Sequence, residues 1–167
     1  LLIIMQDFVH LHVHTQYSLL DGQASVARLV DKAMKNGMKG IAVTDHGNMF
    51  GIKEFTNYVN KKNSGPKGEV KDLKKRIAGI EAGTIECEDK EAEIAACKAK
   101  IVEAENKLFK PIIGCEMYVA RRTMDLKEGK PDQSGYHLIV LAKNETGYHN
   151  LIKLVSHAWT RGYYMRP

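Results

Sequence analysis

The segment FVHLHVHTQYSLLD, residues 8–21, places three histidines and a carboxylate within a short stretch of chain. The alternation of its first half predicts a β-strand, on which His10, His12 and His14 point to one face of the strand. Residues two apart on a strand lie roughly 6–7 Å from each other, so neighbouring imidazoles can lean onto a common ion. A lone histidine is an ordinary core or surface residue, but three in register favour a metal site.

The next segments alternate between helix and strand patterns. Apolar residues recur at helical spacing from Ala24 to Asn36, with Ser25 as a candidate N-cap and Gly37 as the stop. Residues 40–44, GIAVT, have the uninterrupted apolar pattern of a buried parallel strand and end at Asp45 and His46. This β-α-β order predicts an α/β layer or barrel, in which functional residues gather at the carboxyl ends of the strands.

After a second predicted helix over residues 49–62, the composition changes to one dominated by Lys, Glu and Ala. Two apolar stripes with spacings of three, four and seven predict an antiparallel helical hairpin inserted into the domain. The stripes are Leu73, Ile77 and Ile80, then Ile94, Cys97, Ile101 and Leu108. We expect the hairpin to pack on itself, with contact to a partner as the alternative. The predicted division is residues 1–64, an insertion over 65–109, and a continuation of the first domain over 110–167.

The strand pattern resumes at Lys110 and places Glu116 in the middle of an apolar run. A polar loop over residues 123–134 precedes a second strand, 135–143, with His137 near its beginning, and a helix over 144–157 follows. A parallel sheet of four such strands would keep an open edge. Because no closing element follows residue 157, we expect a barrel truncated at its C-terminal side.

The candidate ligands are imidazoles and carboxylates from several strands, a set that suits Zn, Mn or Fe and a multinuclear centre. They are His12, His14, Asp21, His46, Glu116 and His137, with Asp45 beside them. Phosphoester hydrolysis is the reaction class that uses such a centre most fully. Two alternatives stay open, because Asp21 precedes a glycine and could be a turn residue, and Asp45 could cap the following helix. An unpaired carboxylate at Glu116 would be costly to bury, which favours its role as a ligand.

Composition sets the remaining bounds. The 167 residues carry a net charge of +5, which is mildly favourable for a polyanionic partner but forms no discrete patch in the sequence. The three cysteines have no metal-binding spacing and indicate reduced thiols. The opening LLIIM lacks the features of a signal peptide, Met5 resembles a natural start, and no apolar run reaches membrane-spanning length, so we expect a cytoplasmic protein without membrane contact.

Four segments, FVHLHVHTQYSLLDG, GIAVTDHGNMFG, PIIGCEMYVA and YHLIVLAKNETGYHNLIKL, together closely resemble the PHP (polymerase and histidinol phosphatase) domain at the N-terminal region of bacterial DNA polymerase III alpha subunits. The resemblance implies a distorted (βα)7 barrel, partial in this chain, with two or three divalent ions, Zn or Mn, or else Fe or Mg. On the family pattern the metal ligands are His12 and His14 of the HxH motif, Asp21, His46 of the TDH motif, Glu116 of the GxE motif, and His137.

The resemblance also implies a function. The parent would be a DNA-directed DNA polymerase, a nucleotidyltransferase of DNA replication, with DNA, other polymerase subunits and the remainder of the alpha subunit as partners. The domain itself would be a metal-dependent phosphoesterase, a hydrolase with 3′–5′ exonuclease activity, in which His14, Asp21 and His46 position the ions. The family set also includes a further His or Cys and a late Asp-x-His pair, and no Asp-x-His follows His137. The alternatives are a non-catalytic, metal-stabilised module that supports the polymerase core, and a stand-alone phosphoesterase similar to histidinol phosphatase.

Overall fold

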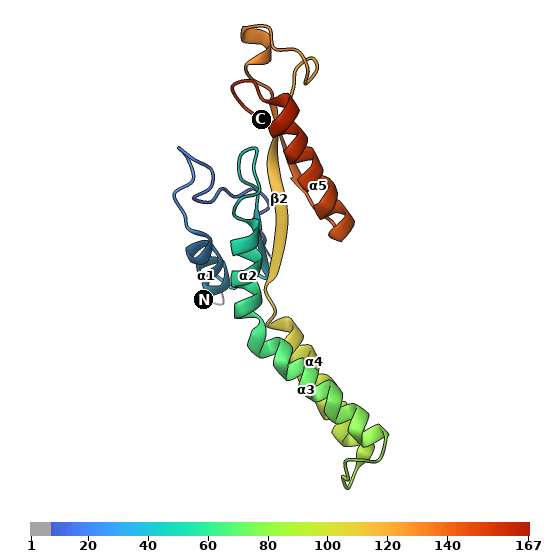
Figure 1. The fold of residues 1–167 in the computed structure, drawn as a ribbon. Helices are drawn as coiled ribbons and strands as arrows, with labels where there is room; N and C mark the ends of the chain where they lie inside the picture. Colours follow the sequence, from blue (N-terminus) through green and yellow to red (C-terminus); the bar gives the residue numbers. More distant parts are fainter. Residues whose placement is uncertain (1–7) are drawn as a thin grey trace. The chain divides into compact units, whose positions relative to one another are not determined.

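The computed structural model describes residues 8–167, in which helices and strands alternate in a mixed α/β arrangement (Figure 1). The elements are α1 (Val26–Lys35), β1 (Gly40–Val43), α2 (Ile52–Lys62), α3 (Ser64–Glu81), α4 (Lys90–Asn106), β2 (Lys110–Val119), β3 (Tyr136–Leu141) and α5 (Glu145–His157). A 3-10 turn (Lys130–Asp132) and a π-helical turn (Ala158–Gly162) complete the list. The predicted α/β class is confirmed, whereas the partial, distorted (βα)7 barrel stays a prediction. The expectation for the opening LLIIM lies outside the described residues.

The three strands form one sheet in the order β1-β2-β3. β1 and β2 are parallel, from Gly40 opposite Lys110 to Val43 opposite Ile113. β2 and β3 are antiparallel, so the prediction of an all-parallel sheet is wrong at β3. The physical reason is the connection, since residues 120–135 contain only the short 3-10 turn and no crossover helix, which a parallel neighbour usually needs. As a result, His137 at the beginning of β3 lies opposite Tyr118 near the end of β2.

The extended segment before residue 15 runs beside β1 but is not a regular strand, so this part of the prediction is also wrong. Its backbone carbonyls at His10 and Val13 accept from Ala42 N and Thr44 N, each at 2.9 Å. Three steps along this segment, from His10 to Val13, therefore match two steps from Ala42 of β1 to Thr44 just after it, which is the offset that a β-bulge introduces. The bulge breaks the simple alternation, and the ring of His10 packs edge-on against Phe8.

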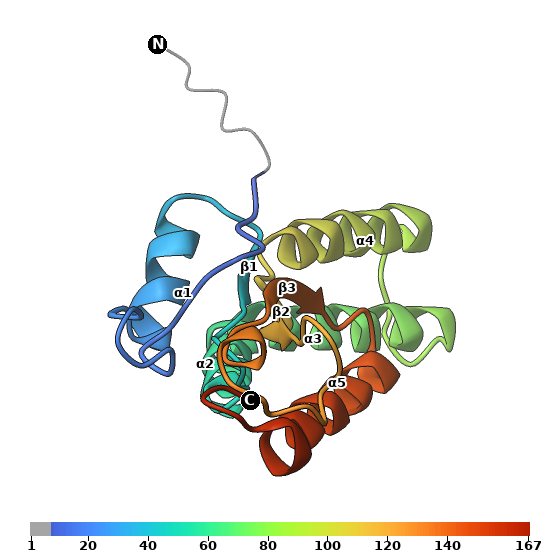
Figure 2. The same cartoon turned by 90° about the horizontal axis from the view of Figure 1, so that it is seen from above.

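Helices cover the sheet from two sides, with α1 and α5 on opposite sides of the strands (Figure 2). α1 begins after Ser25, whose hydroxyl accepts from Arg28 N, as predicted, and its apolar stripe is buried. On the other side, Leu151 and Val155 of α5 pack against Cys115 of β2. Because side chains alternate along β2, this packing leaves Glu116 and Tyr118 on the opposite face of the strand.

Residues Val59–Phe109 form a compact unit of their own, separate from the unit that contains the sheet. Within it α3 and α4 pack along each other and bury Ile80, Cys97 and Ile101. Asn63 joins the two ends of the unit, because its side-chain amide accepts from Phe109 N at 2.9 Å and donates to Phe109 O at 2.8 Å. The bounds 65–109 for an inserted hairpin stay a prediction. None of the helices among residues 8–167 is both long and apolar enough to span a bilayer.

Candidate metal centre

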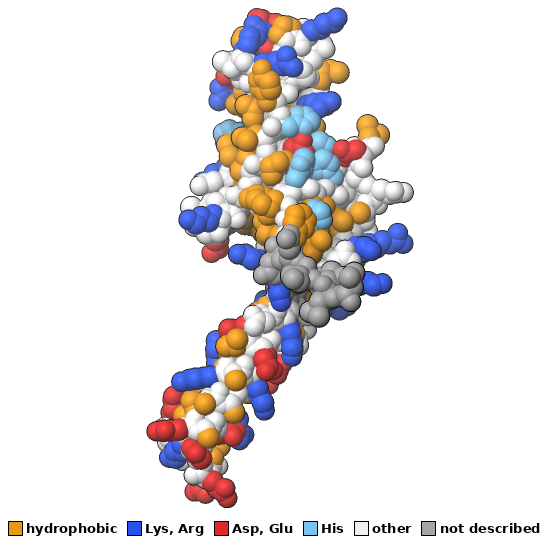
Figure 3. Space-filling view, turned by 180° about the vertical axis from the view of Figure 1, so that it is seen from behind, with side chains coloured by type: hydrophobic (Ala, Val, Ile, Leu, Met, Phe, Trp, Pro, Cys, Tyr) orange, Lys and Arg blue, Asp and Glu red, His pale blue; other side chains and the backbone are white. Residues whose placement is uncertain are grey.

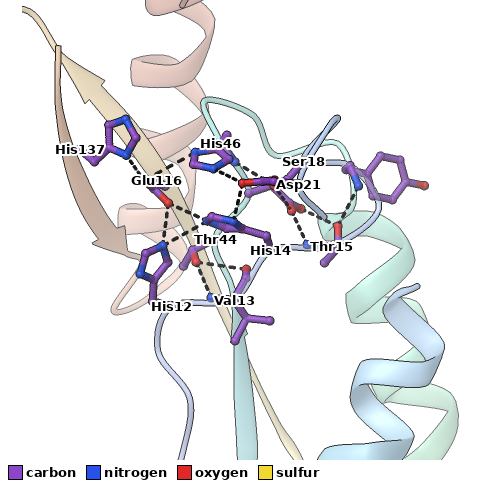
Figure 4. A network of polar contacts seen from close by, with 12 residues as sticks. His12, Val13, His14, Thr15, Ser18, Asp21, Thr44, His46, Glu116 and His137 are labelled. Atoms are coloured by element: carbon purple, nitrogen blue, oxygen red, sulfur yellow. Dashed lines mark hydrogen bonds and ion pairs between the residues drawn. The ribbon is translucent and has the colours of Figure 1, made fainter. Parts of the chain in front are cut away.

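The structure brings all six predicted ligands together at one end of the sheet (Figure 4). His12, His14 and Asp21 come from the irregular segment before α1, and His46 comes from the turn after β1. Glu116 and His137 come from β2 and β3. The imidazoles form one patch on the face shown in Figure 3, with carboxylates among them. His10, which was expected to share a face with His12 and His14, belongs to none of the groups of candidate ligands among the described residues.

Glu116 is the shared partner of four imidazoles. Its Oε2 lies 2.6 Å from Nε2 of both His12 and His14. Its Oε1 pairs with Nδ1 of His137 and lies 3.5 Å from Nδ1 of His46. The carboxylate is 2% exposed, which would be costly without these partners. Burial by itself would raise the pKa of Glu116, but the hydrogen bonds from His12 and His14 and the charges of the imidazoles outweigh burial and lower it.

Asp21 is the second carboxylate of the centre and is more open to solvent. Its Oδ2 lies 2.7 Å from His46 Nε2 and 3.3 Å from His14 Nδ1. The preceding residue, Leu20, has a φ of 81°, in the left-handed region that L residues seldom adopt. Asp21 is thus part of a turn, as the alternative reading proposed, and the same turn points its carboxylate at two imidazoles.

Asp45 supports the candidate centre through hydrogen bonds to the segment that follows His14. Its carboxylate is 1% exposed and accepts three hydrogen bonds, from Thr15 N at 2.6 Å, Thr15 Oγ1 at 2.8 Å and Ser18 Oγ at 2.7 Å. Ser18 Oγ in turn accepts from His46 N at 3.1 Å. Asp45 therefore anchors the segment between His14 and Asp21, and the alternative that it caps the following helix is wrong. Thr15 and Ser18 were not predicted from the sequence, although two small hydroxyl residues shortly after His14 could have indicated partners for a buried carboxylate.

The arrangement of the ligand atoms fits divalent cations. Three groups of three residues each offer ligand atoms within 4.8 Å of one another, namely His12-His14-Glu116, His14-Asp21-His46 and His46-Glu116-His137. Any two of these groups share one residue, so three neighbouring positions are linked. Nδ1 of His46 is buried and makes no hydrogen bond within residues 8–167, because Glu116 Oε1 lies 3.5 Å away in a long ion pair, and a bound cation would satisfy this atom.

The donor set is one of nitrogen and oxygen atoms. The nearby Cys115 is fully buried and donates its Sγ hydrogen to Asp45 O. Burial and the charge of Asp45 raise the pKa of the Cys115 thiol to about 12, so it is protonated in the metal-free protein at neutral pH, and Cys115 belongs to none of the candidate ligand groups among the described residues. Imidazoles with carboxylates suit Zn, Mn or Fe.

Fold and site together define a mixed α/β protein with a candidate polynuclear site of imidazoles and carboxylates. The PHP domain model matches residues 10–167, and the chain belongs to the PHP domain family. The chain is 40% identical over 96% of its length to the DNA polymerase III subunit alpha of Borreliella burgdorferi and to that of Treponema pallidum. It is 32% identical over 97% of its length to that of Aquifex aeolicus. The predicted resemblance is confirmed, and the chain spans about a tenth of the length of these curated relatives.

Proposed function

We propose that this chain is a metal-dependent phosphoesterase domain that acts as a 3′–5′ exonuclease on DNA. The observation that carries the proposal is the linked set of three ligand groups, two of which contain Glu116. A structural site closes its coordination with protein ligands, whereas a hydrolytic site keeps room for water and substrate. The side chains of His12, Asp21 and His137 are 54%, 48% and 44% exposed, so the candidate centre opens to solvent.

The ligands would divide the work by their place in the three groups. Glu116, buried and shared by four imidazoles, would hold ions together with His12 on one side and His137 on the other. His14, Asp21 and His46 form the remaining group and would position the ion that faces the substrate. When bound, divalent ions supply Lewis acidity and a water of lowered pKa. The Asp21 carboxylate, which is 48% exposed, would orient the attacking water.

The relatives support a second part of the proposal, which concerns a longer parent protein. Their printed name is DNA polymerase III subunit alpha, and we propose that the parent of this domain is likewise a DNA-directed DNA polymerase of the bacterial cytoplasm. DNA, the remainder of the alpha subunit and other polymerase subunits would be its partners. The net charge of +5 is compatible with a polyanionic partner. The division into residues 1–64, 65–109 and 110–167 is part of the same proposal.

The test is hydrolysis of a 3′-labelled single-stranded oligonucleotide by the purified chain in Mn²⁺ or Zn²⁺. We expect release of labelled mononucleotide, and a loss of at least about 100-fold in His14→Ala, because mutation of a residue that only orients a metal ligand already costs about 10–100-fold in metal affinity or activity. His149→Ala is the matched control, since this exposed histidine lies on α5, where it pairs with Glu145, and belongs to none of the candidate ligand groups among the described residues.

Two other results would contradict the proposal. Bound metal with no hydrolysis of any phosphoester would favour the non-catalytic module that supports a polymerase core. Cleavage of phosphomonoesters alone would favour the activity similar to histidinol phosphatase.

A further inference from the structure

Tyr118 borders the candidate metal centre on β2. It lies on the same face of the strand as Glu116 and opposite His137 in the sheet. Its ring stacks on the imidazole of His46, with centroids 6.0 Å apart and 13° between the planes, and meets His137 edge-on at 4.9 Å. The guanidinium carbon of Arg166 lies 5.0 Å from the centroid of the same Tyr118 ring. One aromatic ring therefore links a cation to two of the candidate ligands.

Among residues 8–167, no carboxylate side chain forms an ion pair with Arg166. Arg122 pairs with Asp132 and Glu128, and Arg161 pairs with Asp125. Arg166 itself is exposed. Arg166 and Tyr118 also line a cavity of about 620 Å³, so the guanidinium borders open space. A planar guanidinium that lies against an aromatic ring and forms no ion pair is well suited to bind a phosphate.

The position of the guanidinium decides which phosphate it would bind. Within residues 8–167, the ion pairs of the Glu116 and Asp21 carboxylates are with imidazoles. Arg166 is therefore not in contact with the candidate ligand carboxylates. A phosphate held between these ligands is the one to be cleaved. We propose that Arg166 binds the neighbouring phosphate of a DNA single strand. The inference rests on the proposed phosphodiesterase function and makes Arg166 a substrate-binding residue that favours oligonucleotides over substrates with a single phosphate.

The test compares two substrates in Arg166→Gln, with bis(4-nitrophenyl) phosphate as the substrate that has one phosphate and oligothymidylate as the strand. We expect Arg166→Gln to raise KM for oligothymidylate about tenfold and to leave kcat and the hydrolysis of bis(4-nitrophenyl) phosphate within about twofold. Arg166→Lys should recover part of the loss. Arg121→Gln is the matched control, because Arg121 lies 5.4 Å from the Tyr136 ring in a similar stack and Tyr136 alternates with His137 along β3.

An unchanged KM for oligothymidylate in Arg166→Gln would overturn the inference, as would an equal loss on both substrates. If the unmodified protein hydrolyses neither substrate, the proposed function fails, and Arg166 is then judged by binding alone. Fluorescence anisotropy of labelled oligothymidylate should show weaker binding in Arg166→Gln than in Arg121→Gln, and a slope of log affinity against log salt that is smaller by about 0.7. Equal affinities and slopes would overturn the inference independently of catalysis.

Discussion

Replacing Asp45 with alanine removes the carboxylate that anchors the segment between His14 and Asp21. Three charge-assisted hydrogen bonds, two to Thr15 and one to Ser18, are lost inside the protein. Hydrogen bonds to charged groups contribute about 1.5–3 kcal/mol each, and bonds to one carboxylate are not additive. We expect Asp45→Ala to lower the free energy of unfolding by about 4 kcal/mol, and hence Tm by roughly 10 °C in a chain of this size.

The assay is urea unfolding of the metal-free protein in EDTA, followed by metal titration of the folded variant. Asp45→Asn keeps one acceptor oxygen and should cost only about 1–2 kcal/mol. Asp125→Ala is the control, because Asp125 pairs with Arg161 at the exposed surface, where an ion pair contributes about 0–1 kcal/mol. The reasoning is refuted if Asp45→Ala unfolds like Asp125→Ala, or if it binds metal as tightly as the unmodified protein.

Three further predictions follow from single residues. Cys115, fully buried with a pKa raised to about 12, should not react with a thiol reagent in the native protein at pH 8 but should react in denaturant, so a native titration that counts all three thiols would be contrary evidence. Hydrogen bonds from Arg122 lower the pKa of Asp132. The pair therefore stabilises the fold fully at pH values above 3.8, the ordinary pKa of this carboxyl, and this contribution is lost as the pH falls through the lowered pKa. Asp132→Asn should thus lower stability at pH 7 but not near pH 2, and an equal loss at both pH values would contradict this. Asn63→Ala should cost about 2 kcal/mol in urea unfolding, because both backbone groups of Phe109 lose their partner; a loss below about 0.5 kcal/mol would argue against it.

The ligands could be selected from the sequence because the signals are local. His12 and His14 are two residues apart in an extended segment, His46 follows a buried strand, and Glu116 interrupts an apolar one. Each pattern depends only on strand geometry and on the cost of burying a charge. The structure brings these residues together, while their role as metal ligands stays a prediction.

The remaining features depend on contacts between distant segments. The reversal at β3 follows from a connection without a helix, yet the loop's composition did not reveal its path. The bulge that removes His10 from the cluster depends on pairing with Ala42 and Thr44 of the following strand. The anchoring role of Asp45 was likewise hidden, because its partners lie about thirty residues away in the chain.

The proposed metal centre depends most directly on Glu116. The decisive measurement is elemental analysis after equilibrium dialysis against Zn²⁺ or Mn²⁺, on the unmodified chain and on Glu116→Gln, with His12→Ala/His14→Ala as a second variant. We predict at least two equivalents per chain in the unmodified protein and less than one in either variant, with the far-ultraviolet circular dichroism unchanged. Metal absent from the unmodified chain, or present at equal content in the folded variants, would contradict the account.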